Sequence, residues 1–257
     1  MQLMILGGIF MFILGTVFGS FYNVVSYRLP LNLSIVFPPS HCTKCKNRLK
    51  PLELIPILSF LFQKGKCKHC KSKISVMYPI FELLTGILFF LSFWIFYPNN
   101  TMYISLIFVS LLVIVINSDI HHMIIPDEPL ILSSILAIIV RLFLQGDKIL
   151  YIFYDFAFPF IAMLLIKLLG DFIFKKESLG GGDIKLMGVI GLCLGWELSI
   201  FSIFLGSFIA LPISLVILFV NKKRELPFGP YLSIAALILL FLQIDINDIL
   251  NYPFAIC

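Results

Sequence analysis

The sequence predicts an all-α polytopic membrane protein with about eight transmembrane helices and a small zinc-stapled loop domain on the cytoplasmic side. Three observations predict this class. The composition is 60% apolar and only 13% charged, with a mean hydropathy of +1.04. Apolar runs recur along the chain, and the one long polar segment carries two Cys-x-x-Cys pairs. A bilayer core leaves no partner for unpaired backbone groups, so the apolar runs are expected to be helices.

The apolar runs predict the order of the elements. We expect spans at roughly 2–26, 76–97, 102–118, 129–145, 149–169, 184–196, 198–220 and 228–244. A span needs about 20 residues, so the run 184–196 is short. The first run has no basic segment before it and no cleavage motif of small residues, so we expect it to be a retained helix. The predicted organisation is a first transmembrane helix over 1–27, a cytoplasmic zinc-binding loop domain over 28–75, and a seven-helix membrane domain over 76–257.

The placement of basic residues predicts the orientation. If the loop 28–75 is cytoplasmic, the alternation of spans puts 17 of the 19 Lys and Arg residues inside and leaves Arg141 and Lys148 outside. The chain is therefore expected to be a multi-pass protein of the inner, cytoplasmic membrane, with Asp119 and Asp183 facing the cytosol. Anionic headgroups of membrane lipids account for the net charge of +5, so we expect no nucleic-acid partner.

The long polar loop contains a predicted metal site. Its two Cys-x-x-Cys pairs are separated by 21 residues and consist of Cys42, Cys45, Cys67 and Cys70. Four thiolates in this pattern are typical of a tetrahedral structural zinc site. A loop of this size buries little core by itself, so a metal would stabilise its fold. The alternative is a set of isolated redox-active or idle thiols. A cytosolic location argues against structural disulfides.

Two acidic residues interrupt the apolar sequence at the ends of predicted spans. Asp119 ends one apolar run, and Asp183 begins another directly after three glycines. An ionisable residue at a span end is a candidate for function because charge is costly at membrane depth. Two carboxylates that share one proton can divide the roles of general base and general acid, which is the chemistry of aspartyl proteases. The glycines would let an extended substrate approach, and the helix N-terminus would favour the carboxylate form.

Other polar residues offer alternatives. Asp127 has the sequence context of a helix N-cap, and Glu82 is either a structural anchor or part of a substrate site. Ser118 lies near His121, but the surrounding sequence lacks the nucleophile elbow of serine hydrolases. A proton-coupled membrane transporter is a rival function, although the chain shows no clear internal repeat. A structural membrane scaffold whose zinc loop binds secretion partners is a second rival.

The motifs, taken together, resemble the type IV prepilin leader peptidases with N-methyltransferase activity, which are membrane aspartyl peptidases with a Gly-x-Gly-Asp motif. The similarity follows nearly the whole chain in order: GSFYNVVSYRLP at 19–30, PSHC at 39–42, ELIP at 53–56, YPIFE at 78–82, IPD at 125–127, GGGDIKL at 180–186 and PFGP at 227–230.

This resemblance implies a bifunctional enzyme. Such an enzyme cleaves the leader of type IV prepilins or pseudopilins at the cytoplasmic face and then N-methylates the new N-terminal residue from S-adenosyl-L-methionine. The resemblance makes Asp119 and Asp183 the catalytic residues and 76–257 the peptidase domain. It associates the loop 28–75 with methyl transfer, and its matching motif residues for that step are Gly19, Asn23, Arg28 and Glu53. A peptidase without methyltransferase activity is the alternative within the family.

Overall fold

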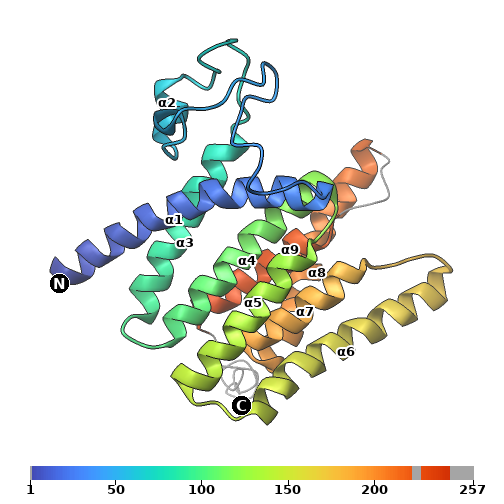
Figure 1. Cartoon of the computed structure of the whole chain (residues 1–257). Coiled ribbons are helices and arrows are strands. Elements are labelled where there is room, and N and C mark those ends of the chain that lie inside the picture. The colour runs from blue at the N-terminus through green and yellow to red at the C-terminus, as the bar shows by residue number, and fades with distance from the viewer. Residues whose placement is uncertain (1, 222–226, 244–257) are drawn as a thin grey trace, which may run out of the picture. The chain divides into compact units, whose positions relative to one another are not determined.

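The structure is a computed structural model that describes residues 2–221 and 227–243. Within these residues it contains nine α-helices, two isolated β-bridges and no strand, which confirms the all-α class (Figure 1). The α-helices are α1 (Gln2–Arg28), α2 (Leu58–Phe62), α3 (Met77–Phe96), α4 (Thr101–His122), α5 (Asp127–Val140), α6 (Ile149–Phe174), α7 (Gly181–Leu194), α8 (Trp196–Asn221) and α9 (Gly229–Leu242). The predicted end of the last span at residue 244 lies outside the described residues.

The chain folds as two compact units. The first unit runs from Met1 to Tyr97 and contains α1, the polar loop with α2, and α3. The second unit runs from Pro98 to Cys257 and contains α4 to α9. The sequence placed residues 76–97 with the later helices, whereas the internal contacts group α3 with α1.

Glycines allow α1 and α3 to pack backbone against backbone. A methyl group added at Gly15 would lie 2.8 Å from the Thr85 carbonyl oxygen, and one added at Gly19 would lie 2.9 Å from the Glu82 Cα. Gly86 faces α1 in the same way. Small residues four positions apart are typical of close helix pairs in membranes, where dispersion contacts replace the hydrophobic effect.

Helix α4 forms the core of the second unit. Phe108, Val109, Leu112 and Val113 are completely buried, and α4 contacts α5, α7 and α9. By contrast, most of the described apolar side chains of α6 and α8 are exposed or partly exposed, including Phe153 on α6. An apolar surface of this kind fits lipid contact and would be unusual in water.

Fewer of the described helices than predicted are long enough to cross a membrane alone. Five described helices are long and apolar enough to cross a membrane: α1, α3, α4, α6 and α8. The eight-span prediction is therefore not confirmed. Helices α5, α7 and α9 have 14 residues each. At about 1.5 Å per residue they reach roughly 21 Å, against about 30 Å for a hydrocarbon core.

Two of these short helices end earlier than the apolar pattern suggested. A π-helical turn, Arg141–Gln145, interrupts the predicted run 129–145 after Val140. Gly195, with a φ of 85°, separates α7 from α8. Conversely, α4 continues past residue 118 to His122, so Asp119 lies inside its last turn.

Candidate active site and metal centre

The four cysteines of the polar loop come together. Their sulfur atoms all lie within 4.8 Å of one another, and the Cys42 and Cys70 sulfurs are 3.8 Å apart. A tetrahedral zinc site with Zn–S bonds of about 2.3 Å has sulfur–sulfur edges of about 3.8 Å. The donor set and its spacing therefore fit a tetrahedral zinc ion.

Each cysteine pair lies on a tight turn, and the two turns are closely alike. The amide of Cys42 donates to the Asn47 carbonyl at 3.0 Å, and that of Cys67 donates to the Ser72 carbonyl at 2.8 Å. The residue after the second cysteine is left-handed in both turns, with φ of 59° at Lys46 and 58° at Lys71. The backbone of each turn thus directs its two thiols, as in zinc knuckles.

The electrostatics of the thiols also favour a cation. Backbone amides of Cys45 and Lys44 lower the pKa of Cys42 to about 6. The Asn47 amide acts to lower the pKa of Cys45, but burial and the three neighbouring thiols raise it to about 11. Four such thiols do not all ionise together without a positive charge among them, and a divalent metal supplies that charge.

The four residues predicted for methyl transfer lie in three neighbourhoods of the first unit. Gly19 packs against Glu82, and Asn23 donates to the Tyr78 carbonyl at 3.2 Å, so both face α3. Arg28, at the end of α1, donates to the Ser34 carbonyl at 2.9 Å. Glu53 accepts from the Lys50 amide at 2.8 Å and lies 4.0 Å from His69 of the second knuckle.

A cavity of about 650 Å³ lies beside Glu53. Its wall consists of apolar side chains, Ser59 and several lysines. Cys67, one of the four candidate zinc ligands, also lines it. The cavity is partly open to the surface, and its volume lies within the range of small-molecule sites. The mixture of one carboxylate, lysines and apolar groups suits a ligand that carries both charges and an aromatic part.

Glu82 anchors the polar loop to α3. Its side chain is buried and accepts a hydrogen bond from the Ile57 amide at 2.7 Å, just before α2. It also bonds to the Ser20 hydroxyl on α1. Of the two roles the sequence left open for Glu82, these contacts support the structural anchor.

In the second unit, Asp119 and Asp183 lie at one end of the helix bundle. Asp119 is in the last turn of α4 and Asp183 in the first turn of α7. Ile125, in the linker between α4 and α5, packs against both Gly182 and Gly229, the residue that begins α9. The end of α4 and the starts of α5, α7 and α9 therefore converge, and they bring the two carboxyl groups near enough to interact electrostatically.

Both carboxyl groups are buried and are held by backbone amides. The Gly229 amide donates to Asp119, and the Gly180 amide donates to Asp183. Asp119 is 5% exposed and Asp183 is 7% exposed. The Asp183 Oδ1 atom is buried without a hydrogen-bond partner in the described part of the chain. A buried polar atom normally has a partner, so an unpaired acid oxygen beside another acid marks a place where water or a substrate can bind.

The surroundings of the pair differ from the sequence prediction at Asp127. Asp127 is not the N-cap of α5, because Pro126 holds that position without a side-chain cap. Asp127 instead forms an ion pair with Lys185, whose Nζ lies 2.8 Å from both carboxylate oxygens. Ser118 donates to the Ile124 carbonyl at 2.6 Å, so its hydroxyl holds the linker.

Two neighbours of the pair had no predicted role. Gly229 was noted only as part of a motif, yet a methyl group there would lie 2.6 Å from the Asp119 Oδ2 atom. Lys185 was noted only as a basic residue and as part of another motif. The sequence indicated these two residues only through the motifs that contain them. No periodic pattern connects residues that lie so far apart along the chain.

Comparisons with known proteins identify two family matches. Residues 13–96 match the bacterial peptidase A24 N-terminal domain, and residues 106–215 match the type IV leader peptidase family. No solved structure matches the chain.

Several similar proteins bear the name prepilin leader peptidase/N-methyltransferase. The one from Bacillus subtilis is 39% identical over 89% of this chain and 91% of its own length. That from Klebsiella pneumoniae is 34% identical over 75% of this chain and 87% of its own length. That from Myxococcus xanthus is 36% identical over 74% of this chain and 56% of its own length. The chain belongs to the type IV leader peptidase family.

Proposed function

We propose that this chain is a membrane aspartyl endopeptidase that cleaves the leader of type IV prepilins or pseudopilins and then N-methylates the new N-terminal residue. Family membership and the names of its relatives support this activity. The observation that carries the peptidase part is the pair of buried carboxyl groups, Asp119 and Asp183, which interact across two helices.

The pair can hydrolyse a peptide bond without a metal. When it holds one proton, the ionised carboxylate accepts a proton from water while the water oxygen bonds to the scissile carbonyl carbon. The protonated partner then supplies its proton to the nitrogen as the carbon–nitrogen bond breaks. The proton taken from water restores the starting state. The proton therefore belongs to the pair, and either carboxyl group could play either role.

The proposed membrane arrangement has eight helices, with the catalytic pair at the cytoplasmic face of the inner membrane. Helices α5, α7 and α9 would enter the bilayer although each is too short to cross it alone. Packing around the buried helix α4 supports this placement. The distribution of lysine and arginine supports the orientation. The remaining partners in this proposal are membrane lipids, and it involves no nucleic acid.

Zinc is the metal proposed for Cys42, Cys45, Cys67 and Cys70. Four protein thiolates fill a tetrahedral shell and leave no position for a catalytic water, so its role would be structural. The Glu53–His69 contact links the second knuckle to the wall of the cavity. The metal would in this way shape the cavity from one side.

The cavity beside Glu53 is the proposed place for S-adenosyl-L-methionine. This donor supplies an electrophilic methyl group on sulfur, and it carries a carboxylate, an amine and an adenine ring. The lysines of the wall, such as Lys66 and Lys68, suit the carboxylate, Glu53 suits the amine or ribose hydroxyls, and Phe62 suits the ring. Gly19, Asn23 and Arg28 would act from α1, where Gly19 and Asn23 help to pack it on α3.

One experiment tests both activities. The purified chain is incubated in nanodiscs with a prepilin and methyl-labelled S-adenosyl-L-methionine, and cleavage and label are measured on the same product. We expect a shortened pilin that carries the label at its N-terminus. Cleavage without label would leave a peptidase-only enzyme, and an intact prepilin would refute the proposal.

Asp119→Asn and Glu128→Gln form a matched pair for the same assay. Both replace an acid by its amide near the linker that follows α4, but only Asp119 belongs to the carboxyl pair. We expect cleavage to disappear in the first variant and persist in the second. Normal cleavage by Asp119→Asn would refute the paired-carboxyl mechanism.

A further inference from the structure

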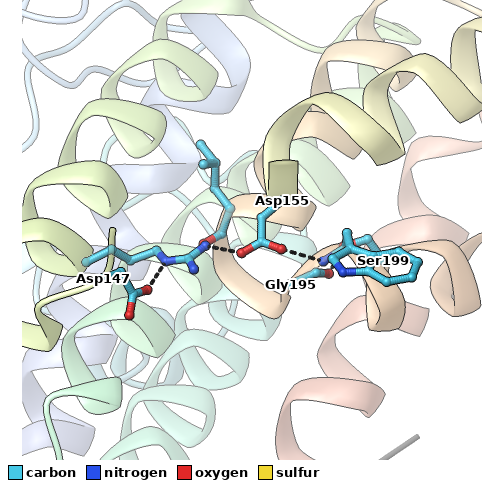
Figure 2. Close-up of polar contacts among 7 residues, drawn as sticks. Asp147, Asp155, Gly195 and Ser199 are labelled. Carbon is cyan, nitrogen blue, oxygen red and sulfur yellow. Dashed lines mark hydrogen bonds and ion pairs between the residues drawn. The ribbon is translucent and has the colours of Figure 1, made fainter. Parts of the chain in front are cut away.

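Asp155 is a buried acid that the cleavage mechanism does not use. It lies on α6, and its side chain is 12% exposed. One carboxylate oxygen lies 2.7 Å from a guanidinium nitrogen of Arg141, and the other accepts the Trp196 amide at 3.0 Å (Figure 2). Both oxygens therefore have partners, and these partners come from two different segments of the chain.

Arg141 joins this acid to the C-terminal end of α7. Its side chain is also 12% exposed, and it donates to the Leu192 carbonyl at 3.2 Å and to Asp147 at 2.7 Å. The last carbonyl groups of a helix lack intrahelical partners and carry negative partial charge. A buried guanidinium at this place satisfies one of them.

Asp155 serves the start of α8 in a corresponding way. Trp196 is the first residue of α8, so its amide is one of the donors that the helix itself leaves unpaired. Figure 2 shows the Asp155 carboxylate beside Gly195, the single residue between α7 and α8. The Arg141–Asp155 pair thus connects the segment after α5 with α6, α7 and α8.

Backbone contact fixes α7 against α6 at the same level. A methyl group added at Gly191 of α7 would collide with the Asp155 carbonyl oxygen, and one at Gly188 would lie 2.6 Å from the Phe156 ring. Because these side chains are absent, the two helices pack closely at this level. The ion pair contacts the C-terminal end of α7 and thereby fixes the position of that end relative to α6.

We infer that the Arg141–Asp155 pair positions Asp183 for cleavage by fixing α7 along its axis. This inference rests on the proposed function. Asp183 lies in the first turn of α7, and Arg141 contacts Leu192 in its last turn, about 14 Å away along the axis at 1.5 Å per residue. The helix contains no proline, so a shift at one end moves the other. A displacement of about 1 Å can reduce a catalytic rate by about 100-fold.

The pair acts through α7 and touches neither catalytic carboxyl group, so Arg141 and Asp155 are positioning residues. Loss of one partner leaves a buried charge unpaired, and the helices must then move to hydrate it. This movement would reduce turnover and leave substrate binding nearly unchanged. It would also leave methylation unchanged, because the candidate methyl-transfer residues belong to the other unit.

The test compares Asp155→Asn, Arg141→Gln and Arg141→Lys with Asp147→Asn as the matched control. Asp147 contacts the same guanidinium, but its side chain is 33% exposed and bonds to no residue of α6, α7 or α8 in the described part of the chain. For each variant in nanodiscs, kcat and KM are measured for prepilin cleavage, and methylation is measured on a pilin supplied already cleaved. Thermal unfolding gives the folded fraction.

We expect Asp155→Asn and Arg141→Gln to lower kcat per folded molecule by about tenfold or more, with KM within about twofold of the wild type. Arg141→Lys should recover part of this loss because its ammonium group still reaches Asp155. Asp147→Asn should cleave normally. If Asp155→Asn does not fold, the kcat of Arg141→Lys is compared with that of Arg141→Gln, and a higher kcat for Arg141→Lys would support the inference.

Wild-type kcat in the folded Asp155 and Arg141 variants would overturn the inference, as would equal losses of cleavage and methylation. Either result can be obtained while the wild-type chain cleaves prepilin. Failure of the wild-type chain to cleave would instead refute the proposed function, so the two failures are distinguishable.

Discussion

The two ends of α7 place buried acids in opposite situations. At the N-terminal end, Asp183 has a second acid nearby and one buried oxygen without a hydrogen-bond partner in the described structure. At the C-terminal end, both oxygens of Asp155 have partners, and one is a guanidinium. The two residues are 7% and 9% exposed, so burial does not distinguish them. The comparison shows that hydrogen-bond partners distinguish the two acids. An acid with an unpaired oxygen is available for chemistry, whereas an acid with both oxygens paired stabilises the structure.

Asp183→Asn offers the largest contrast with Asp155→Asn. We expect Asp183→Asn to lower cleavage by at least about 1,000-fold, since it removes one member of the acid–base pair. Its unfolding temperature should stay level or rise, because an electrostatically unfavourable acid is replaced by a neutral amide. Asp155→Asn should lower the unfolding temperature, because it leaves Arg141 unpaired. Cleavage assays with thermal unfolding in the same detergent provide the measurement, and equal destabilisation by both variants would break the comparison.

Cys42→Ser extends the comparison to groups that need a metal as partner. We expect about one zinc per chain in the wild type and none in this variant, measured by elemental analysis after dialysis. Methylation should fall with the zinc content, whereas cleavage of prepilin should be less affected. Cys193→Ser, which changes a cysteine outside the cluster, is the control. A wild-type protein without zinc would contradict the metal assignment.

Gly229→Ala tests whether space around Asp119 matters as much as charge. The added methyl group would lie 2.6 Å from the Asp119 Oδ2 atom, so the carboxyl group must move. We expect cleavage to fall by about tenfold or more. Gly181→Ala is the matched control because a methyl group there meets no atom within 4 Å. Similar rates for both glycine variants would show that the pair tolerates displacement.

Among these variants, Lys185→Met should have the smallest effect, a slight change in the stability of the fold. Its ion pair with Asp127 has side chains that are 53% and 54% exposed, and exposed pairs contribute about 0–1 kcal/mol to stability. We therefore expect a change of no more than about 1 kcal/mol in the free energy of unfolding, measured by chemical denaturation. A much larger loss would mean that this pair resembles the Arg141–Asp155 pair despite its exposure.

The sequence predicted the all-helical class and the cysteine cluster, and it singled out Asp119 and Asp183 as candidate catalytic residues. Apolar runs of sufficient length define helices, and Cys-x-x-Cys turns define their own local geometry. It did not predict that α5 would change at Val140 into the π-helical turn that Arg141 begins. Arg141 contacts two acids there, and one of these lies on α6. Such a contact depends on packing between distant segments and leaves no periodic trace in the sequence.

The role of Asp127 shows the same limit. An acid at the start of a helix is a good N-cap by local rules, yet Pro126 takes that position. Asp127 instead pairs with a lysine far along the chain. Likewise, the partner of Asp119 at Gly229 depends on how α9 packs against α4.

The close packing of α1 on α3 has a consequence for the polar loop. Gly19 lets α1 approach the backbone at Glu82, and Glu82 in turn holds the Ile57 amide of the loop. A residue of any size at position 19 would separate the helices and pull this anchor away from Ile57. The missing side chain at residue 19, inside the apolar layer, therefore helps to determine where the water-facing polar loop is held.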